Sequence, residues 1–379
     1  MKPVSLTRSA VPRLKADAAS QAQVLIDLSG EYSQFTVPGP VADAIVHAAR
    51  TTDLGRHNTA GGKYLRHAVQ QKLAEVNALE VREDAIVLTG GGTAALCYAL
   101  AALCDPGESV LVPDPGPPGY ARLCASWGIA PVPYPLGLDG VPDYDALEDL
   151  IGHDTKAILL NTPANPSGAV LDGVRLLELV DFARDHDLYV VSDEELDMLR
   201  FAGGPALGPA YCDTDGRVVS VFSMARTHCL AGLRLGYAVA APPIAAAIAG
   251  AQDSQLAGPS TLALSAGLAA LTMDRSVVDS MIASYVQQRD IVLAMLPPEV
   301  VPQPPAGGYY MLVDIASCGF PDSRAFAETF RQAAGVKVAP GLLFGANIPQ
   351  MVRLTLAVRE RALGEGVEKL AAFIAECAQ

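Results

Sequence analysis

The segment VVSVFSMARTHCLAGLRLGYAVA at residues 218–240 decides the fold. It starts with the β-branched run VVSVFS, passes through a polar turn and ends in the apolar run LGYAVA. Similar runs occur earlier as AIVLTG, SVLVPD, KAILLN and LYVVSD, and helix-length stretches such as TAALCYALAALC and VRLLELVDFARDHD lie between them. Strand-like runs that alternate with helices predict an α/β domain of three layers, in which helices cover both faces of a mostly parallel sheet.

The remaining sequence predicts a second, smaller domain. The whole chain has 379 residues, which exceeds the usual length of one small domain. After the alternating region, SVVDSMIASYVQQRDIVLAML reads as a long helix, MVRLTLAV as a strand and GEGVEKLAAFIAEC as a closing helix, which is typical of an α+β unit. We expect an N-terminal arm and part of the small domain in residues 1–44, the large domain in 45–280 and the small domain in 281–379.

Composition excludes several classes of partner. The net charge of −14 leaves no basic stripe for a nucleic acid. The alanine-rich stretch at 238–252 contains Pro242 and Pro243 and is shorter than the roughly 20 apolar residues of a membrane span. Seven cysteines without C-x-x-C spacing indicate reduced thiols, so we expect a cytoplasmic protein without a metal site. Its expected partners are a small molecule and a second copy of itself.

A glycine-rich turn offers a site for a phosphate group. In LTGGGTAAL, residues 88–96, a predicted strand ends, three glycines turn the chain and a helix begins at Thr93. The free amides at a helix N-terminus bind anions, and glycine lets a ligand approach the backbone closely. Such turns also occur without a ligand, and this one is neither a G-x-G-x-x-G fingerprint nor a P-loop.

Polar residues follow three more of the predicted strands. NTPANPSGAV supplies Asn161 and Asn165, VVSDEELDML supplies Asp193, and the segment that opened this section supplies Ser223 and Arg234. Ligands of open α/β sheets bind outside the carboxyl ends of the strands. We therefore expect these side chains to meet at one ligand site.

In order and spacing, these segments resemble the aspartate aminotransferase superfamily, the fold-type I pyridoxal-phosphate enzymes of class I/II. The resemblance extends over nearly the whole chain, through NTAGGKYLRHAV, DPGESVLVPDPGPPGY, PAGGYYML, VAPGLLFG and VRLTLA. It implies the pyridoxal-phosphate-dependent transferase fold, a pyridoxal phosphate (PLP) cofactor and a homodimer whose two chains share each pocket.

The resemblance also implies a role for each matching residue. Asp193 is expected to keep the pyridine nitrogen protonated and Asn165 to hydrogen-bond the ring's phenolic oxygen. Arg353 matches the arginine that binds the substrate's α-carboxylate, and Arg56 falls where a tyrosine reaches into the partner's site. From the residues alone, Asp193 also suits a helix N-cap, Asn165 a turn before proline and Arg353 a surface strand. The residues expected to bind the phosphate are Gly91, Gly92, Thr93, Ser223 and Arg234.

Arg226 departs from the family pattern at the position that carries the chemistry. Eight residues before the phosphate arginine, the family has a lysine that forms a Schiff base with PLP, and this sequence has Arg226. An arginine stays protonated below a pH of about 12 and is a poor nucleophile and a poor base. We therefore expect Arg226 to bind a group and not to shuttle a proton, paired with a carboxylate such as Asp193 or with an anionic ligand. His228 is the candidate for an acid or base that titrates near neutrality, and a histidine packed in the turn is an equally good interpretation of it.

Other positions of the expected pocket have changed as well. Pro117 stands at the aromatic residue that stacks on the ring, Leu196 at a tyrosine, Ala225 at a serine and Arg56 at the cross-subunit tyrosine. Several changes together favour a natural departure over a single engineered substitution.

Four functions stay open. The first is an aminotransferase-like enzyme for a small amino acid or an amine that carries a carboxylate, which holds PLP or pyridoxamine phosphate non-covalently. The second is an ordinary aminotransferase whose lysine was changed to Arg226. The third is a catalytically silent partner subunit or a binding protein. The fourth is a cofactor-free enzyme in which Arg226 and Arg234 bind an anionic substrate.

Overall fold

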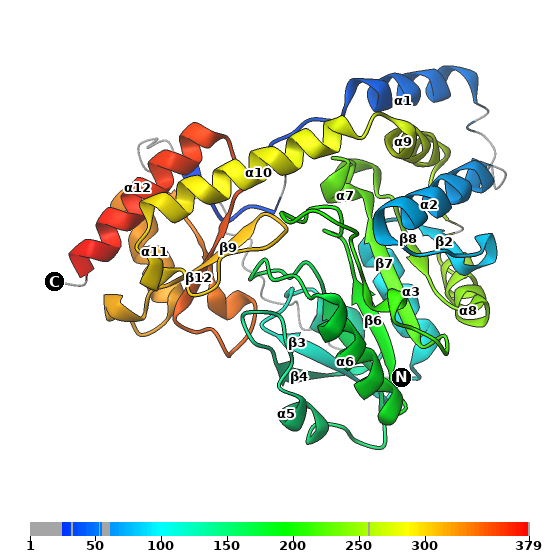
Figure 1. Ribbon diagram of the computed structural model, residues 1–379, viewed down its shortest axis with the longest axis horizontal. Coiled ribbons are helices and arrows are strands. Elements are labelled where there is room, and N and C mark those ends of the chain that lie inside the picture. Colours follow the sequence, from blue (N-terminus) through cyan, green and yellow to red (C-terminus); the bar gives the residue numbers. More distant parts are fainter. Residues whose placement is uncertain (1–24, 32, 53, 55–60, 257, 378–379) are drawn as a thin grey trace, which may run out of the picture.

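A seven-stranded sheet forms the centre of the larger lobe (Figure 1). The computed structural model describes residues 25–31, 33–52, 54, 61–256 and 258–377. The strand order is β2-β8-β7-β6-β5-β3-β4; β8 runs antiparallel to both neighbours, and all other pairs are parallel. The strands are β2 (Ile86–Thr89), β3 (Ser109–Asp114), β4 (Ala130–Pro135), β5 (Thr155–Asn161), β6 (Tyr189–Asp193), β7 (Val218–Ser223) and β8 (Gly236–Val239).

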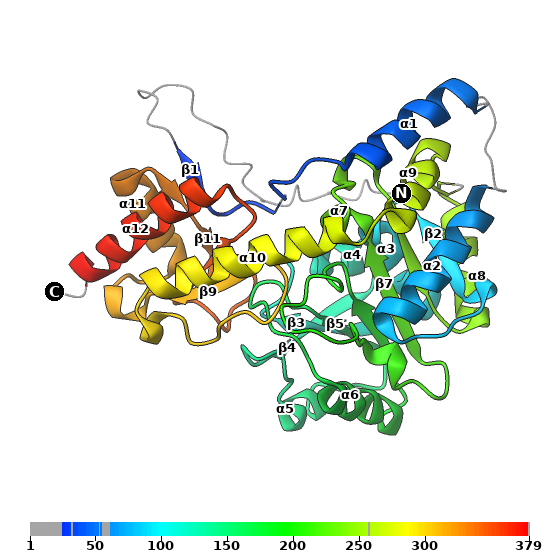
Figure 2. The same cartoon turned by 45° about the horizontal axis from the view of Figure 1, so that its top comes forward.

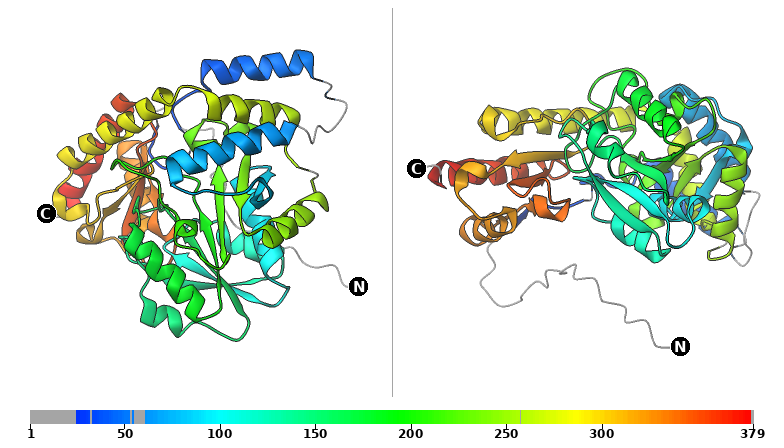
Figure 3. Two further views of the ribbon diagram at one scale, coloured as in Figure 1. Left: turned by 45° about the vertical axis from the view of Figure 1, so that its right-hand side comes forward. Right: turned by 90° about the horizontal axis from the view of Figure 1, so that it is seen from below.

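Helices cover both faces of this sheet, as Figure 3 shows from two further sides. Alternate residues of one strand point to opposite layers: Val87 packs in the cluster of α3 and α8, whereas Ile86 and Leu88 pack in the cluster of α2 and α9. The three-layer α/β architecture predicted from the sequence is thus confirmed. The helices of this lobe are α1 (Gly39–Thr51), α2 (Gly61–Asn77), α3 (Gly92–Leu103), α4 (Tyr120–Ser126), α5 (Tyr144–Glu148), α6 (Gly173–Asp185), α7 (Met224–Thr227), α8 (Pro242–Asp253) and α9 (Thr261–Thr272).

The smaller lobe is built around a three-stranded antiparallel sheet of order β11-β12-β9. A separate parallel pair joins β1, near the start of the described chain, to β10 (Figure 2). One hydrophobic core unites β1, β9, β10 and β12 with three helices, and Ala339 of β11 packs in a small separate cluster. The elements are β1 (Ile26–Asp27), β9 (Tyr310–Asp314), β10 (Val336–Lys337), β11 (Ala339–Pro340), β12 (Met351–Thr355), α10 (Ser276–Met295), α11 (Ser323–Ala334) and α12 (Glu360–Cys377).

The domain limits expected at residues 44 and 280 stay proposals, and α10 runs across the second of them. Within the described residues, no helix is both long and apolar enough to cross a membrane. Single turns of 3-10 helix complete the fold: η1 (Glu83–Ala85), η2 (Pro209–Tyr211), η3 (Ala231–Leu233), η4 (Pro298–Val300), η5 (Ala316–Cys318) and η6 (Gly341–Leu343).

Candidate functional site

The carboxyl ends of β5 and β6 bring three of the expected site residues together. Asn161 and Asp193 are register partners at the ends of these strands, and Asn161 Nδ2 donates to the Asp193 carbonyl oxygen at 3.0 Å. The Asn165 amide donates to Asn161 Oδ1 at 2.7 Å, and Arg353 Nη1 donates to Asn165 Oδ1 at 2.8 Å. Hydrogen bonds therefore connect Asp193, through the two asparagines, to Arg353 of the smaller lobe.

A second group of expected residues meets at the N-terminus of α3, which begins at Gly92 without a side-chain cap. Gly91 has a φ of 106°, and a Cβ placed on it would lie 2.8 Å from Arg234 Nη2. A Cβ on Gly92 would lie 3.0 Å from Cβ of Ser223. Thr93 lies in the first helical turn, whose amides have no partner within the helix.

Arg234 is exposed, and its guanidinium makes no hydrogen bond or ion pair with any described residue. A free guanidinium beside open helical amides suits a phosphate group, which accepts several charge-assisted hydrogen bonds. These residues therefore fit the phosphate of the expected cofactor.

Asp193 fits the opposite end of such a cofactor. Its carboxylate is buried; Tyr120 donates its hydroxyl to Oδ2 at 2.8 Å, and the Glu195 amide donates to Oδ1 at 3.2 Å. Burial, with the charge of Glu195, raises the pKa of Asp193 to about 7, although Tyr120, the Glu195 amide and Arg226 act in the opposite direction. A cation beside it would favour its ionised form, as a protonated ring nitrogen does.

The raised pKa of Asp193 predicts a pH-dependent effect of Asp193→Asn on stability. Between the ordinary pKa of 3.8 and about 7, the folded protein binds more protons than the unfolded chain, so this group contributes less to stability as pH rises. Asparagine carries no charge to bury. The free energy of unfolding is measured in urea on the cofactor-free mutant and wild type. The mutant value minus the wild-type value should be about 1–3 kcal/mol larger at pH 8 than at pH 5. The exposed control Asp253→Asn should show no such shift, and an equal difference at both pH values for Asp193→Asn would contradict the prediction.

Arg226 lies in α7, directly after β7, and its charge is paired within the chain. Its Nε lies 3.3 Å from Glu195 Oε2 and its Nη2 lies 3.8 Å from Glu31 Oε2. Nη1 donates to the Glu31 carbonyl oxygen. The expected partner is a carboxylate such as Asp193; the carboxylate that reaches the guanidinium is that of Glu195, two residues further on, while the charge of Arg226 also lowers the pKa of Asp193 against the larger effect of burial. Burial lowers the pKa of Arg226, but nearby acidic groups, above all the Glu195 carboxylate, raise it by more. The net pKa lies above the ordinary value, so the side chain stays charged.

Arg353 is the largest fully buried side chain among the described residues, with 1% of its surface exposed. Besides Asn165, it contacts Glu31 Oε1 at 3.4 Å and the Ser29 carbonyl oxygen at 3.0 Å. Its guanidinium carbon lies 4.1 Å from the ring centre of Tyr310 and 4.5 Å from that of Phe344. It belongs to the candidate site and not to a surface strand.

His228 does not fit the role expected of it. Its ring is buried, and Nδ1 shares a hydrogen bond of 2.8 Å with the Thr227 hydroxyl. Burial and the charge of Lys72 lower the pKa of His228 to about 4, more than Asp197 raises it. The expectation that His228 titrates near neutrality is therefore corrected. A buried ion pair of Lys72 and Asp197, which sequence reasoning missed, lies in its surroundings.

Several site residues had no signal in the sequence or only a weak one. Glu195 lies two positions after Asp193, and Tyr120 is the last residue of PGPPGY, the segment that contains Pro117. The sequence predicted no role for either residue. Glu31 has no motif that identifies it as a neighbour of Arg353. Arg56 lies outside the described residues.

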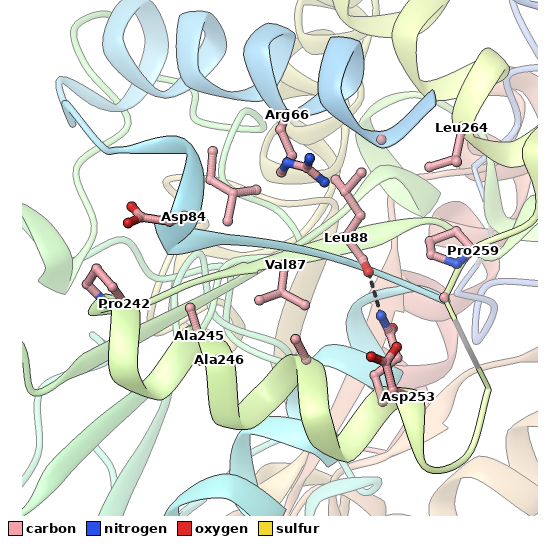
Figure 4. A pocket seen from close by; sticks show the side chains of 15 residues that line it. Arg66, Asp84, Val87, Leu88, Pro242, Ala245, Ala246, Asp253, Pro259 and Leu264 are labelled. Atoms are coloured by element: carbon pink, nitrogen blue, oxygen red, sulfur yellow. Dashed lines mark hydrogen bonds between the residues drawn. The ribbon is translucent and has the colours of Figure 1, made fainter. Parts of the chain in front are cut away.

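A separate pocket of about 440 Å³ lies between α2, β2 and α8 (Figure 4). Arg66, Leu88, Pro242 and Leu264 line it, and Gln252 Nε2 donates to the Leu88 carbonyl oxygen at 3.0 Å. It contains none of the site residues described above.

Comparisons with known proteins show the family of the chain. Residues 25–370 match the family of class I and II aminotransferases. An aspartate aminotransferase of Musicola paradisiaca is 28% identical over 375 residues, which cover 97% of this chain and 92% of the relative. A probable aspartate/prephenate aminotransferase of Thermus aquaticus is 32% identical over 360 residues, which cover 92% of this chain and 91% of the relative.

Solved structures show the same fold. Aspartate aminotransferase from Thermotoga maritima has a TM-score of 0.85 at 26% identity, covering 93% of this chain and 92% of that one. The Thermus thermophilus enzyme with maleate has a TM-score of 0.84 at 29% identity, covering 92% and 91%. PLP is the cofactor of this family, and its members act on small molecules. The chain is therefore an aminotransferase-like enzyme that belongs to the class I and II aminotransferase family.

Proposed function

We propose that this enzyme holds PLP or pyridoxamine phosphate without a covalent bond and acts on a small amino acid, or on an amine that carries a carboxylate. The observation that carries the proposal is Arg226. It follows β7 between Ser223 and Arg234, where the resemblance places the family's lysine. Its guanidinium forms ion pairs with Glu195 and Glu31. A guanidinium at this position cannot replace an amine as nucleophile.

The chain's own residues suit each end of the cofactor. Arg234 and the amides of Gly92 and Thr93 would hold its phosphate, Asp193 the ring nitrogen and Asn165 the phenolic oxygen. When bound, the cofactor supplies a ring that accepts electrons from the reacting carbon.

The reacting end is dominated by two arginines. Arg353 would orient the substrate's carboxylate, and Arg226 would bind a neighbouring anionic group while keeping its proton. Ordinary transamination by a lysine base is not part of this proposal.

Comparing two cofactor forms by calorimetry tests the proposal. Pyridoxamine phosphate has no aldehyde, so it binds only through non-covalent contacts. If the site works as proposed, PLP and pyridoxamine phosphate bind with dissociation constants within about tenfold of each other, a difference of roughly 1.4 kcal/mol. PLP binding that is far tighter and releases slowly would contradict it. Failure of both to bind, with inorganic phosphate still bound, would favour the cofactor-free enzyme.

A homodimer is part of the proposal, and exposed apolar residues of the larger lobe support it. Tyr64 on α2 is 71% exposed, and Leu54 and Leu256 are also exposed. A Cβ on Gly90, in the glycine turn, would lie 3.2 Å from the Leu256 side chain. Seven free thiols support the cytoplasm as the compartment.

The dimer predicts a specific result in sedimentation. At micromolar concentration the protein should sediment as a dimer, and its interface should bury more than about 1,600 Å². Tyr64→Glu should shift it toward the monomer, because a charge would be buried. Val174→Glu on α6, where the valine is 65% exposed, is the matched control and should leave the dimer intact. A monomeric wild-type protein would contradict the prediction.

A further inference from the structure

Glu31 occupies the space between the two arginines of the candidate site. One carboxylate oxygen lies 3.4 Å from Arg353 Nη1, and the other lies 3.8 Å from Arg226 Nη2. Glu31 and Arg353 are 322 positions apart in the sequence, and Glu31 and Arg226 are 195 positions apart. A single carboxylate thus bridges guanidinium groups from the two lobes.

The backbone around Glu31 is held independently of this carboxylate. The Glu31 carbonyl oxygen accepts hydrogen bonds from Arg226 and, at 3.0 Å, from the Tyr309 hydroxyl. On one side, β1 pairs with β10; on the other, the Ser33 hydroxyl contacts the Tyr285 hydroxyl at 2.9 Å. The Glu31 side chain is 44% exposed, so it can turn into solvent while its backbone stays in place.

The positive charges of Arg226 and Arg353 favour the binding of another carboxylate between them when the Glu31 side chain turns away. Among the described residues, Glu31 forms ion pairs with both guanidinium groups, and Glu195 forms one with Arg226. Without Glu31, the buried guanidinium of Arg353 loses the carboxylate with which it pairs among the described residues, which is costly unless another anion enters.

The site also keeps donors that Glu31 does not use. Arg353 Nε and the Tyr310 hydroxyl are buried, and neither has a hydrogen-bond partner among the described residues. Buried donors without a partner are uncommon, and they are available to a ligand's oxygen atoms.

We propose that Glu31 is the resident carboxylate of an anion site formed by Arg226 and Arg353, and that a small carboxylic acid binds there by displacing it. The proposal takes Arg353 as the carboxylate-binding residue of the proposed function, but it requires no cofactor. Glu31 then sets the affinity of the site, because a ligand binds only to molecules in which the Glu31 side chain has turned away.

Maleate, an unreactive dicarboxylate, is the probe that tests the competition. Its affinity is measured by calorimetry on the full chain without cofactor. If Glu31 fills the site in about nine molecules out of ten, Glu31→Gln should lower the dissociation constant of maleate about tenfold. Glu31→Ala, which removes the whole carboxyl group, should give a similar gain, and Arg353→Gln should abolish binding.

Asp27→Asn is the matched control. Asp27 lies in the same segment, but its carboxylate contacts Ser29 and Lys337 and neither arginine. This variant removes the same charge without opening the site, so maleate affinity should stay within about twofold of wild type.

The outcomes separate this inference from the proposed function. Unchanged or weaker maleate binding in both Glu31 variants, or an equal gain in Asp27→Asn, would overturn the competition between Glu31 and the acid. Absence of binding in every variant would overturn it as well. Failure of PLP and pyridoxamine phosphate to bind, with the maleate results as expected, would overturn only the proposed function.

Discussion

Arg226→Lys is expected to convert the site into one that captures PLP covalently. Lysine at this position supplies an amine between Ser223 and Arg234. Burial favours its neutral, nucleophilic form, whereas Glu195 and Glu31 favour its charged form. PLP should then dissociate about 100-fold more slowly or slower still, because a covalent bond must break first. Borohydride reduction followed by intact-protein mass spectrometry measures the capture, as a mass increase in the mutant and none in wild type.

Arg226→Met is the control for this change. It removes the positive charge and keeps a long side chain, but supplies no amine, so no capture is expected. A lysine mutant that captures no PLP would contradict the placement of Arg226 at the reacting end. Recovery of plain transamination by the lysine mutant would favour an ordinary aminotransferase whose lysine was changed.

Arg234→Ala is expected to weaken binding of PLP and pyridoxamine phosphate by about 100-fold or more, because charge-assisted hydrogen bonds are each worth about 1.5–3 kcal/mol. Arg234 makes no hydrogen bond or ion pair with any residue that the structure describes, so its loss should leave the fold intact. Calorimetry gives the affinity, and circular dichroism gives the fold.

Arg82→Ala is the matched control for Arg234→Ala. Arg82 is an exposed arginine of the same lobe and pairs with Asp84 at 2.6 Å. Its loss should not change cofactor affinity. Equal affinity of wild type and Arg234→Ala would show that the glycine turn and this arginine do not form a phosphate site.

Much of the fold could be predicted because buried strands carry local signals. The six apolar runs recognised in the sequence correspond to six strands of the large sheet, since each is covered on both faces. The sequence did not reveal β4, which contains Pro131 and Pro133. This strand lies at the sheet edge, where proline is tolerated and the apolar pattern is weaker.

The site was predictable where it follows from strand ends. Asn161, Asp193 and Ser223 each close a strand, and parallel strands bring their carboxyl ends to one edge. Glu31 could not be found in this way, because its contact with Arg353 depends on the packing of the smaller lobe. The pKa of His228 likewise depends on burial beside Lys72, which lies far away in the sequence.

Borohydride treatment of the wild-type protein saturated with PLP tests the central claim, that the cofactor is held without a covalent bond. The account predicts that PLP binds in a 1:1 ratio to the chain, is removed by dialysis and leaves no mass increase on the reduced protein. A stable mass increase on any lysine of the wild-type chain, or no binding of PLP, would contradict it.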